Sequence, residues 1–195
     1  MDVSRRSQPA GLDRQMLVAT AARLITDRGA AGLSMRSLAT ALGVTPMALY
    51  NHVRNKDELI DAVLDTALRR VEVPEDGDPV TVVCGIMLST YDVLIGYRDL
   101  VPLYLERRGA RGPNAIWLGE KIHEALGGLG IDRDRAQRIL RALIIQALGF
   151  AAFGAAPSDP PAIRDVFRDS LDWTLNGALK EDARHARDAT RAGDE

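Results

Sequence analysis

The polar side chains with the most informative spacing occur in residues 45–56, TPMALYNHVRNK. Thr45 followed by Pro46 is typical of a helix start, because threonine can cap free N–H groups and proline has the φ angle of the first helical position. A short helix with small and polar groups and a free, capped N-terminus fits the DNA major groove, about 12 Å wide. Its partial positive charge favours phosphate, and Arg54 and Lys56 follow where backbone phosphates would lie. The pattern predicts a contact with nucleic acid.

The spacing patterns of common catalytic and metal sites do not occur in the sequence: it has no G-x-S-x-G, H-E-x-x-H or C-x-x-C. The three histidines, His52, His123 and His185, are too dispersed to suggest a metal cluster. The run GGLG at 127–130 lacks the third glycine and the preceding strand of a dinucleotide loop, so it is interpreted as a helix break. We therefore predict that the chain is not an enzyme and has no catalytic residue, metal or cofactor.

Two helices are expected before the polar segment. The first covers residues 13–28 and ends at Gly29, which is typical of a C-terminal cap. Its apolar residues recur on one helical face: Leu17, Val18, Ala21, Ala22 and Ile25. The second is capped by Ser34 and ends at Gly43.

A tight turn, LGV at 42–44, connects the second helix to a very short third helix that extends to about residue 53. Asn55 then caps a fourth helix, with Glu58 placed to reach back to the cap, and this helix continues to about Val73. Two short capped helices joined by such a turn form a helix-turn-helix. The inward positions of this unit are Leu38, Leu42, Val44, Leu49 and Val53.

The stretch VPEDGDP at 73–79 breaks the helical pattern with two prolines, one glycine and three acids. Beyond it, helices are expected at about 79–96, 98–108, 114–126, 132–156 and 160–179. No hairpin Asn-Gly pair and no sustained period-two alternation predicts a strand. The fold class is therefore all-α with about nine helices, divided into an arm (1–12), a head (13–60), a body (61–180) and a charged, disordered tail (181–195).

Composition and charge agree with a globular protein of ordinary type. The chain has 195 residues, of which 46% are hydrophobic and 27% charged. The single cysteine, Cys84, cannot form an internal disulfide, so a reducing cytoplasm is the expected compartment. The net charge is about +3 over residues 1–60 and −5 over 61–195, which suits a basic head on an acidic body. The uncharged run at 142–157 is shorter than the roughly 20 residues of a membrane span, so it is interpreted as a buried helix.

Residues 13–60 resemble the DNA-binding domain of the tetracycline-repressor (TetR) family. The run LYNHVRNK at 49–56 is especially close to the tetracycline-repressor branch. The remaining two-thirds of the chain agree with the family only in outline. The matching features are a first helix that ends in glycine, Arg36 in the first turn of the second helix, Leu42-Gly43-Val44, Leu49-Tyr50, His52, and Asn55-Lys56-x-x-Leu59.

The resemblance implies a transcription regulator, most simply a repressor, that binds a double-stranded DNA operator. It places Arg36 near a base edge, and arginine bidentate to guanine is the commonest specific contact. It places the start of the third helix against bases and the following polar residues against phosphates, although a packing role is an alternative for His52. The predicted DNA-binding residues are Arg36, Thr45, Pro46, Met47, Ala48, Tyr50, Asn51, His52 and Lys56.

Apolar stripes in the last two helices predict a homodimer. The helix at 132–156 is apolar over most of its circumference and must be buried on two sides. Together with the helix at 160–179, a two-fold axis would make a four-helix bundle, as the resemblance also implies. The alternative is a core within one chain. The predicted interface residues are Leu140, Ile144, Ala147, Ala151, Ile163, Phe167, Ser170 and Thr174.

The body also contains residues suited to an apolar pocket with a few polar groups, although ordinary core residues would look the same. The resemblance implies an unidentified small-molecule effector in this domain, which releases the dimer from a palindromic operator. The alternative is a regulator of the same fold whose C-terminal domain binds a protein partner or no ligand. The predicted pocket residues are Met87, Tyr91, Tyr104, Trp117, His123 and Phe150.

Overall fold

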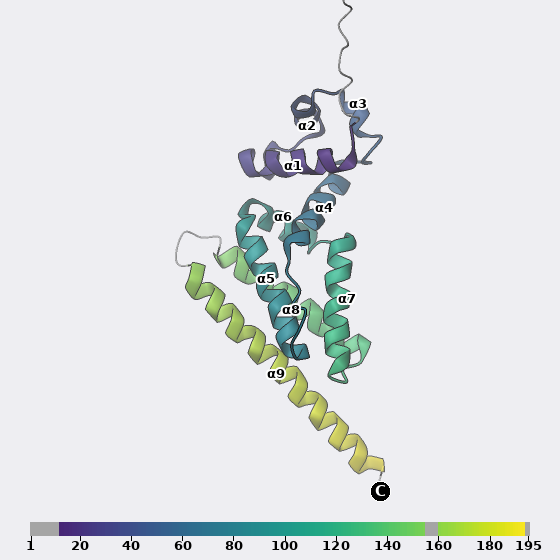
Figure 1. Ribbon diagram of the computed structural model, residues 1–195, viewed down its shortest axis with the longest axis vertical. Coiled ribbons are helices and arrows are strands. Elements are labelled where there is room, and N and C mark those ends of the chain that lie inside the picture. Colours follow the sequence, from purple (N-terminus) through teal and green to yellow (C-terminus); the bar gives the residue numbers. More distant parts are fainter. Residues whose placement is uncertain (1–11, 155–159, 194–195) are drawn as a thin grey trace, which may run out of the picture.

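The computed structural model describes residues 12–154 and 160–193, and all regular elements in these ranges are helices (Figure 1). The predicted all-α fold class is confirmed. Three short 3-10 helices, η1 Ala30–Gly32, η2 Leu68–Arg70 and η3 Arg98–Leu100, connect longer ones. The α-helices are α1 Arg14–Arg28, α2 Met35–Leu42, α3 Pro46–Leu49, α4 Lys56–Ala67, α5 Pro79–Gly96, α6 Val101–Arg107, α7 Pro113–Gly128, α8 Arg133–Gly154 and α9 Pro160–Gly193.

Helices α1 to α3 form a small layer at one end of the molecule, and α4 leads from it into the bundle of α5 to α9 (Figure 1). The predicted domain boundary at residue 60 falls inside α4, so one continuous helix belongs to both parts. The predicted arm lies almost entirely outside the described residues.

The first two helices begin with the caps that their sequences provide. The Asp13 side chain accepts a hydrogen bond from the Met16 N–H at 2.7 Å. Ser34 and Ser37 form a reciprocal capping box, each hydroxyl accepting the backbone N–H of the other at 3.0 and 2.9 Å. The predicted N-cap at Ser34 is confirmed.

The turn between α2 and α3 depends on Gly43, whose φ of 67° and ψ of 29° are left-handed. A side chain is strained in that conformation, whereas glycine adopts it freely. Pro46 occupies the first turn of α3 as predicted, but the Thr45 side chain makes no capping hydrogen bond. Helix α3 is also shorter than predicted, because a non-helical turn follows Leu49 and continues to Val53.

Helix α4 begins as predicted, with the Asn55 side chain accepting the Glu58 N–H at 2.8 Å. The Glu58 carboxylate, however, accepts the N–H of Arg54 and not that of Asn55. The α-helix ends at Ala67, earlier than expected, and η2 follows it and ends before Val71.

The body is built around α5 and α8, which pack against each other and against both α7 and α9. By length and composition alone these two helices could cross a membrane, but here they form the interior of the bundle. The predicted helix at 98–108 divides into η3 and α6.

Helix α9 is longer than predicted and continues to Gly193. The expectation of a helix end near residue 179 is therefore wrong, whereas the expectation of a disordered tail at 181–195 stays a prediction. Residues 180–193 contain four alanines and no proline, which is a helix-forming composition.

Candidate nucleic-acid interface and ligand cavity

The helix-turn-helix is held by a few fully buried apolar residues. Leu38 of α2, Leu49 of α3 and Val53 after it are buried in one cluster with Leu17 and Ile25 of α1. Helix α3 has only four residues and cannot be stable alone, so this burial fixes its position. The N–H of Val44 also donates to the carbonyl of Ala39 at 3.0 Å, which closes the turn.

Most of the side chains predicted to contact DNA face solvent. The Met47 side chain is the most open, with 76% of its surface exposed. Within the group, Arg36, Thr45, Pro46, Met47, Tyr50 and Asn51 are exposed, whereas Ala48, His52 and Lys56 are half-buried. The arrangement leaves the N-terminal half of α3 free to approach a groove, and a role for each residue in binding DNA stays a prediction.

A polar cluster that was not predicted from the sequence fixes the end of this unit. The Arg14 guanidinium of α1 donates to the His52 carbonyl at 2.9 Å and to the Glu58 carboxylate at 2.8 Å. The other carboxylate oxygen of Glu58 accepts the N–H of Arg54 at 2.8 Å. These bonds tie the segment after α3 to both α1 and α4. The Arg54 N–H, and after it Arg14, hold the pKa of the Glu58 carboxyl below its usual 4.5.

Glu58 is expected to stabilise the head at neutral pH and to lose this effect in acid. Its pKa is lowered on folding, so its contribution is present above about pH 4.5 and disappears as the pH falls through the folded-state pKa. Glu58→Gln keeps an acceptor for the Arg54 N–H but removes the charge beside Arg14.

Thermal denaturation of the parent and of Glu58→Gln, followed by circular dichroism, tests this expectation. The difference in melting temperature should be largest near neutral pH and shrink toward about pH 3. Glu75→Gln, at an exposed position between α4 and α5, serves as the control. A difference that is the same at every pH would contradict the assignment.

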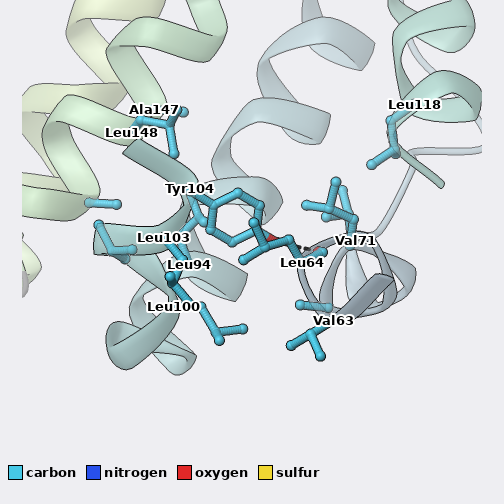
Figure 2. Packing of buried hydrophobic residues seen from close by; sticks show 14 of the residues in the cluster. Val63, Leu64, Val71, Leu94, Leu100, Leu103, Tyr104, Leu118, Ala147 and Leu148 are labelled. Carbon is cyan, nitrogen blue, oxygen red and sulfur yellow. Dashed lines mark hydrogen bonds between the residues drawn. The ribbon is translucent and has the colours of Figure 1, made fainter. Parts of the chain in front are cut away.

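The body contains a cavity of about 130 Å³ whose lining is predominantly apolar. Helices α5, α6, α7 and α8 and the 3-10 helix η2 contribute to it, including Leu68, Met87, Tyr104, Leu118, Ala147 and Leu148. Figure 2 shows Tyr104 between Leu94 and Leu64, with Leu118 and Ala147 on different neighbouring helices.

Of the six predicted pocket residues, Met87 and Tyr104 line this cavity and the other four do not. Tyr91 and Phe150 pack on Phe167 with ring centroids 5.3 and 5.1 Å away. Trp117 faces away from the core, with 50% of its surface exposed, and His123 is buried on α7 outside the lining. A role for these four residues in binding a ligand stays a prediction, since aromatic type alone does not distinguish core from pocket.

Three aspartates at four-residue spacing on α4 connect the head to the body. Asp57 and Asp61 face the Arg107 guanidinium of α6, whose Nη2 donates to Asp61 at 2.7 Å. The buried Asp65 accepts the Ala115 N–H at 2.9 Å and the Asn114 side-chain amide at 2.7 Å, at the start of α7.

The neighbouring turn of α4 has a further bond to the body, because the Tyr104 hydroxyl donates to the Leu64 carbonyl (Figure 2). These contacts were not predicted, although the four-residue spacing of the aspartates can be seen in the sequence.

Several residues predicted for a dimer interface are instead enclosed by their own chain. Leu140, Ala147, Ala151 and Phe167 are buried within the single chain, which disfavours a contact with a second copy, and their part in an interface stays a prediction. Thr174 accepts the Gln146 side-chain amide at 2.7 Å, within the chain. Ile163, Ser170 and Thr174 are half-buried, and Ile144 is exposed at the margin of the cavity.

Large apolar side chains on α8 and α9 do face outward, at positions that were not predicted. On α9, 69% of the Trp173 surface is exposed, and Val166 lies two helical turns earlier on the same side. On α8, Ile145 and Phe153 are exposed as well. Much of the predicted interface thus faces inward, and the outward face contains fewer but larger groups.

Comparisons with known proteins agree with this architecture. The family model described as "Bacterial regulatory proteins, tetR family" matches residues 17–63. An HTH-type transcriptional regulator of Saccharopolyspora erythraea is 31% identical over 130 residues, 66% of this chain and 54% of that protein. The tetracycline repressor protein class C of Escherichia coli is 35% identical over 103 residues, 51% of this chain and 47% of that protein. The chain spans about half the length of these curated relatives.

Among solved structures, BioQ of Mycobacterium smegmatis is similar over nearly its whole length. It is 26% identical, with a TM-score of 0.75, and the match covers 87% of this chain and 99% of that one. A second structure, of BioQ with its double-stranded DNA operator, matches with a TM-score of 0.72 over the same shares.

Proposed function

The chain belongs to the TetR family of bacterial regulatory proteins, and from this premise we propose that it is a transcription regulator, a repressor, that binds a double-stranded DNA operator through α2 and α3. The observation that supports this most directly is the exposed N-terminal half of α3, held from behind by Leu38 and Leu49. A relative of the same architecture has been solved on its operator. Since such regulators act on DNA inside the cell, the cytoplasm is the proposed location.

A homodimer is the proposed binding form. One helix-turn-helix of this size makes few base contacts, and two identical heads linked by a two-fold axis bind far more tightly than one. The exposed apolar residues on α8 and α9, Ile145, Phe153, Val166 and Trp173, are the proposed contact surface. The operator is then a near-palindrome with half-sites separated by roughly 34 Å, one helical turn, or a multiple of it.

The apolar cavity is the proposed site of a small-molecule effector. A ligand there touches Leu68, which directly follows α4, and Tyr104, whose hydroxyl bonds to the backbone of α4. Ligand and DNA binding are coupled if the ligand binds better to a form of the protein with a different position of α4. A relative named as a tetracycline repressor supports a small molecule over a protein partner.

Arg36→Ala is expected to weaken binding to the cognate operator by roughly 1–3 kcal/mol and to relax preference at one base pair, because a bidentate contact to guanine is lost. The measurement is fluorescence anisotropy on the operator and on single-base variants, at fixed salt.

Arg36→Lys separates the two possible roles of this side chain. Lysine retains the positive charge but not the planar pair of donors. If Arg36→Lys binds the operator as tightly as the parent, the side chain contacts phosphate and the assignment to a base is wrong. The same conclusion follows if Arg36→Ala lowers the affinity for all DNA sequences equally. A protein that binds no duplex even at low salt would overturn the proposed function.

A further inference from the structure

The lining of the cavity contains one charged side chain. Arg108 lies at the end of α6 and contributes to the rim, whereas no aspartate, glutamate or lysine is part of the lining. Within the described residues the Arg108 guanidinium takes part in no hydrogen bond or ion pair, although that of the neighbouring Arg107 is bound to Asp61. The Arg108 guanidinium thus lies beside an apolar cavity without a partner among the described residues.

The backbone also singles out this position. Arg108 has a φ of 58° and a ψ of 45°, and in the described part of the chain it is the one residue other than glycine with a positive φ. Glycine or asparagine is the usual choice at such a helix end, so arginine is retained there at a conformational cost. A role for the guanidinium at the rim accounts for that choice.

The volume of the cavity restricts the size of the ligand. A cavity of about 150 Å³ lined by leucine, isoleucine and phenylalanine accepts benzene, and this one measures about 130 Å³. The polar groups near it are largely engaged: the Thr90 hydroxyl donates to the Ile86 carbonyl at 2.8 Å, and the Tyr104 hydroxyl donates to Leu64. The interior therefore suits one apolar ring or a short branched chain without polar substituents.

We propose that the cavity binds a compact apolar monocarboxylate, with the ring or branched chain inside and the carboxylate on the Arg108 guanidinium at the rim. Arginine and carboxylate form a charge-assisted, often bidentate pair, which is stronger than a bond between neutral groups. A cationic ligand would meet only repulsion from this lining. The inference rests on the proposed function, because it specifies the chemical class of the effector.

Benzoate and its neutral isostere benzamide test the proposal by isothermal titration calorimetry on the full chain. Benzoate should bind at least about tenfold more tightly than benzamide, since only the carboxylate pairs with the guanidinium. Arg108→Gln should abolish this preference, while Arg141→Gln, at an exposed arginine on α8 outside the lining, should leave it unchanged.

Two further variants keep the result decisive. Arg108→Gly removes the guanidinium and favours the observed left-handed backbone, so it retains the fold and should lose the preference in the same way. Ala147→Leu fills the cavity and should weaken binding of both compounds. Equal binding of benzoate and benzamide, no binding of either, or an unchanged preference in Arg108→Gly would overturn the proposal.

A parallel measurement of the release of labelled operator DNA distinguishes the proposed ligand class from the proposed function on which it rests. A ligand-free protein that binds no operator contradicts the proposed function, whatever the calorimetry shows. Operator binding together with benzoate binding at Arg108, and release of the DNA by benzoate but not by benzamide, supports both proposals. Operator binding without any preference for the carboxylate contradicts the ligand class alone.

Discussion

Phe167→Ala is expected to lower the free energy of unfolding by about 3–5 kcal/mol, the range for removing a fully buried aromatic ring. Phe167 has no exposed surface and lies between Tyr91 and Phe150, at centroid distances of 5.3 and 5.1 Å. This cluster joins α9 to α5 and α8. The substitution leaves a cavity between α9, α5 and α8 that the packed helices cannot fully close, and the melting temperature should fall by about 10 °C.

Ile116→Ala is the matched control, because it also removes a large apolar side chain but from an exposed position on α7. Its effect on unfolding should stay within about 0.5 kcal/mol. Chemical denaturation followed by circular dichroism measures both variants. If Phe167→Ala unfolded with the parent's free energy but dissociated the protein, the residue would belong to an interface after all.

Trp173→Glu is expected to convert the protein to a monomer and to weaken operator binding by about 100-fold or more, because the two heads then bind independently. The Trp173 side chain is 69% exposed on α9, and a carboxylate placed between two apolar faces would be desolvated without a partner. Sedimentation velocity gives the oligomeric state, and fluorescence anisotropy gives the affinity for the operator.

The second tryptophan of the chain supplies the control for this experiment. Trp117 is 50% exposed on α7, outside the proposed contact surface, so Trp117→Glu should remain a dimer with unchanged affinity. A Trp173→Glu variant that sediments as a dimer would show that α8 and α9 associate through other residues or not at all.

The head could be predicted from the sequence more completely than the body because its signals are local. Ser34, Gly43 and Asn55 determine where helices begin and end through bonds to residues within a few positions, and Pro46 does so through its fixed φ. Such signals do not depend on how the chain folds back. The bonds of Arg14 to His52 and Glu58, 38 and 44 residues away, contain no comparable local signal.

In the body the same reasoning identified helices but not their outward faces. Helix α8 is apolar around most of its circumference, so its periodicity does not reveal which stripe faces α5 and which faces solvent. On α9 the predicted interface stripe included the buried Phe167, and the exposed Trp173 was overlooked. Between the expected helices at 98–108 and 114–126, a Cβ at Gly112 would lie 2.3 Å from the Asp65 carboxyl carbon, so glycine is needed there for the contact between α4 and α7.

The row of carboxylates on α4 has a consequence for protein engineering. A hybrid that exchanges the DNA-reading head needs a splice point, and the predicted domain boundary would place it after residue 60. That junction would separate Asp57 from Asp61 and Asp65 and would leave Arg107 facing a foreign residue. A hybrid spliced at residue 55 or before retains the entire row with the helices it binds, and it is the fusion expected to respond to its inducer.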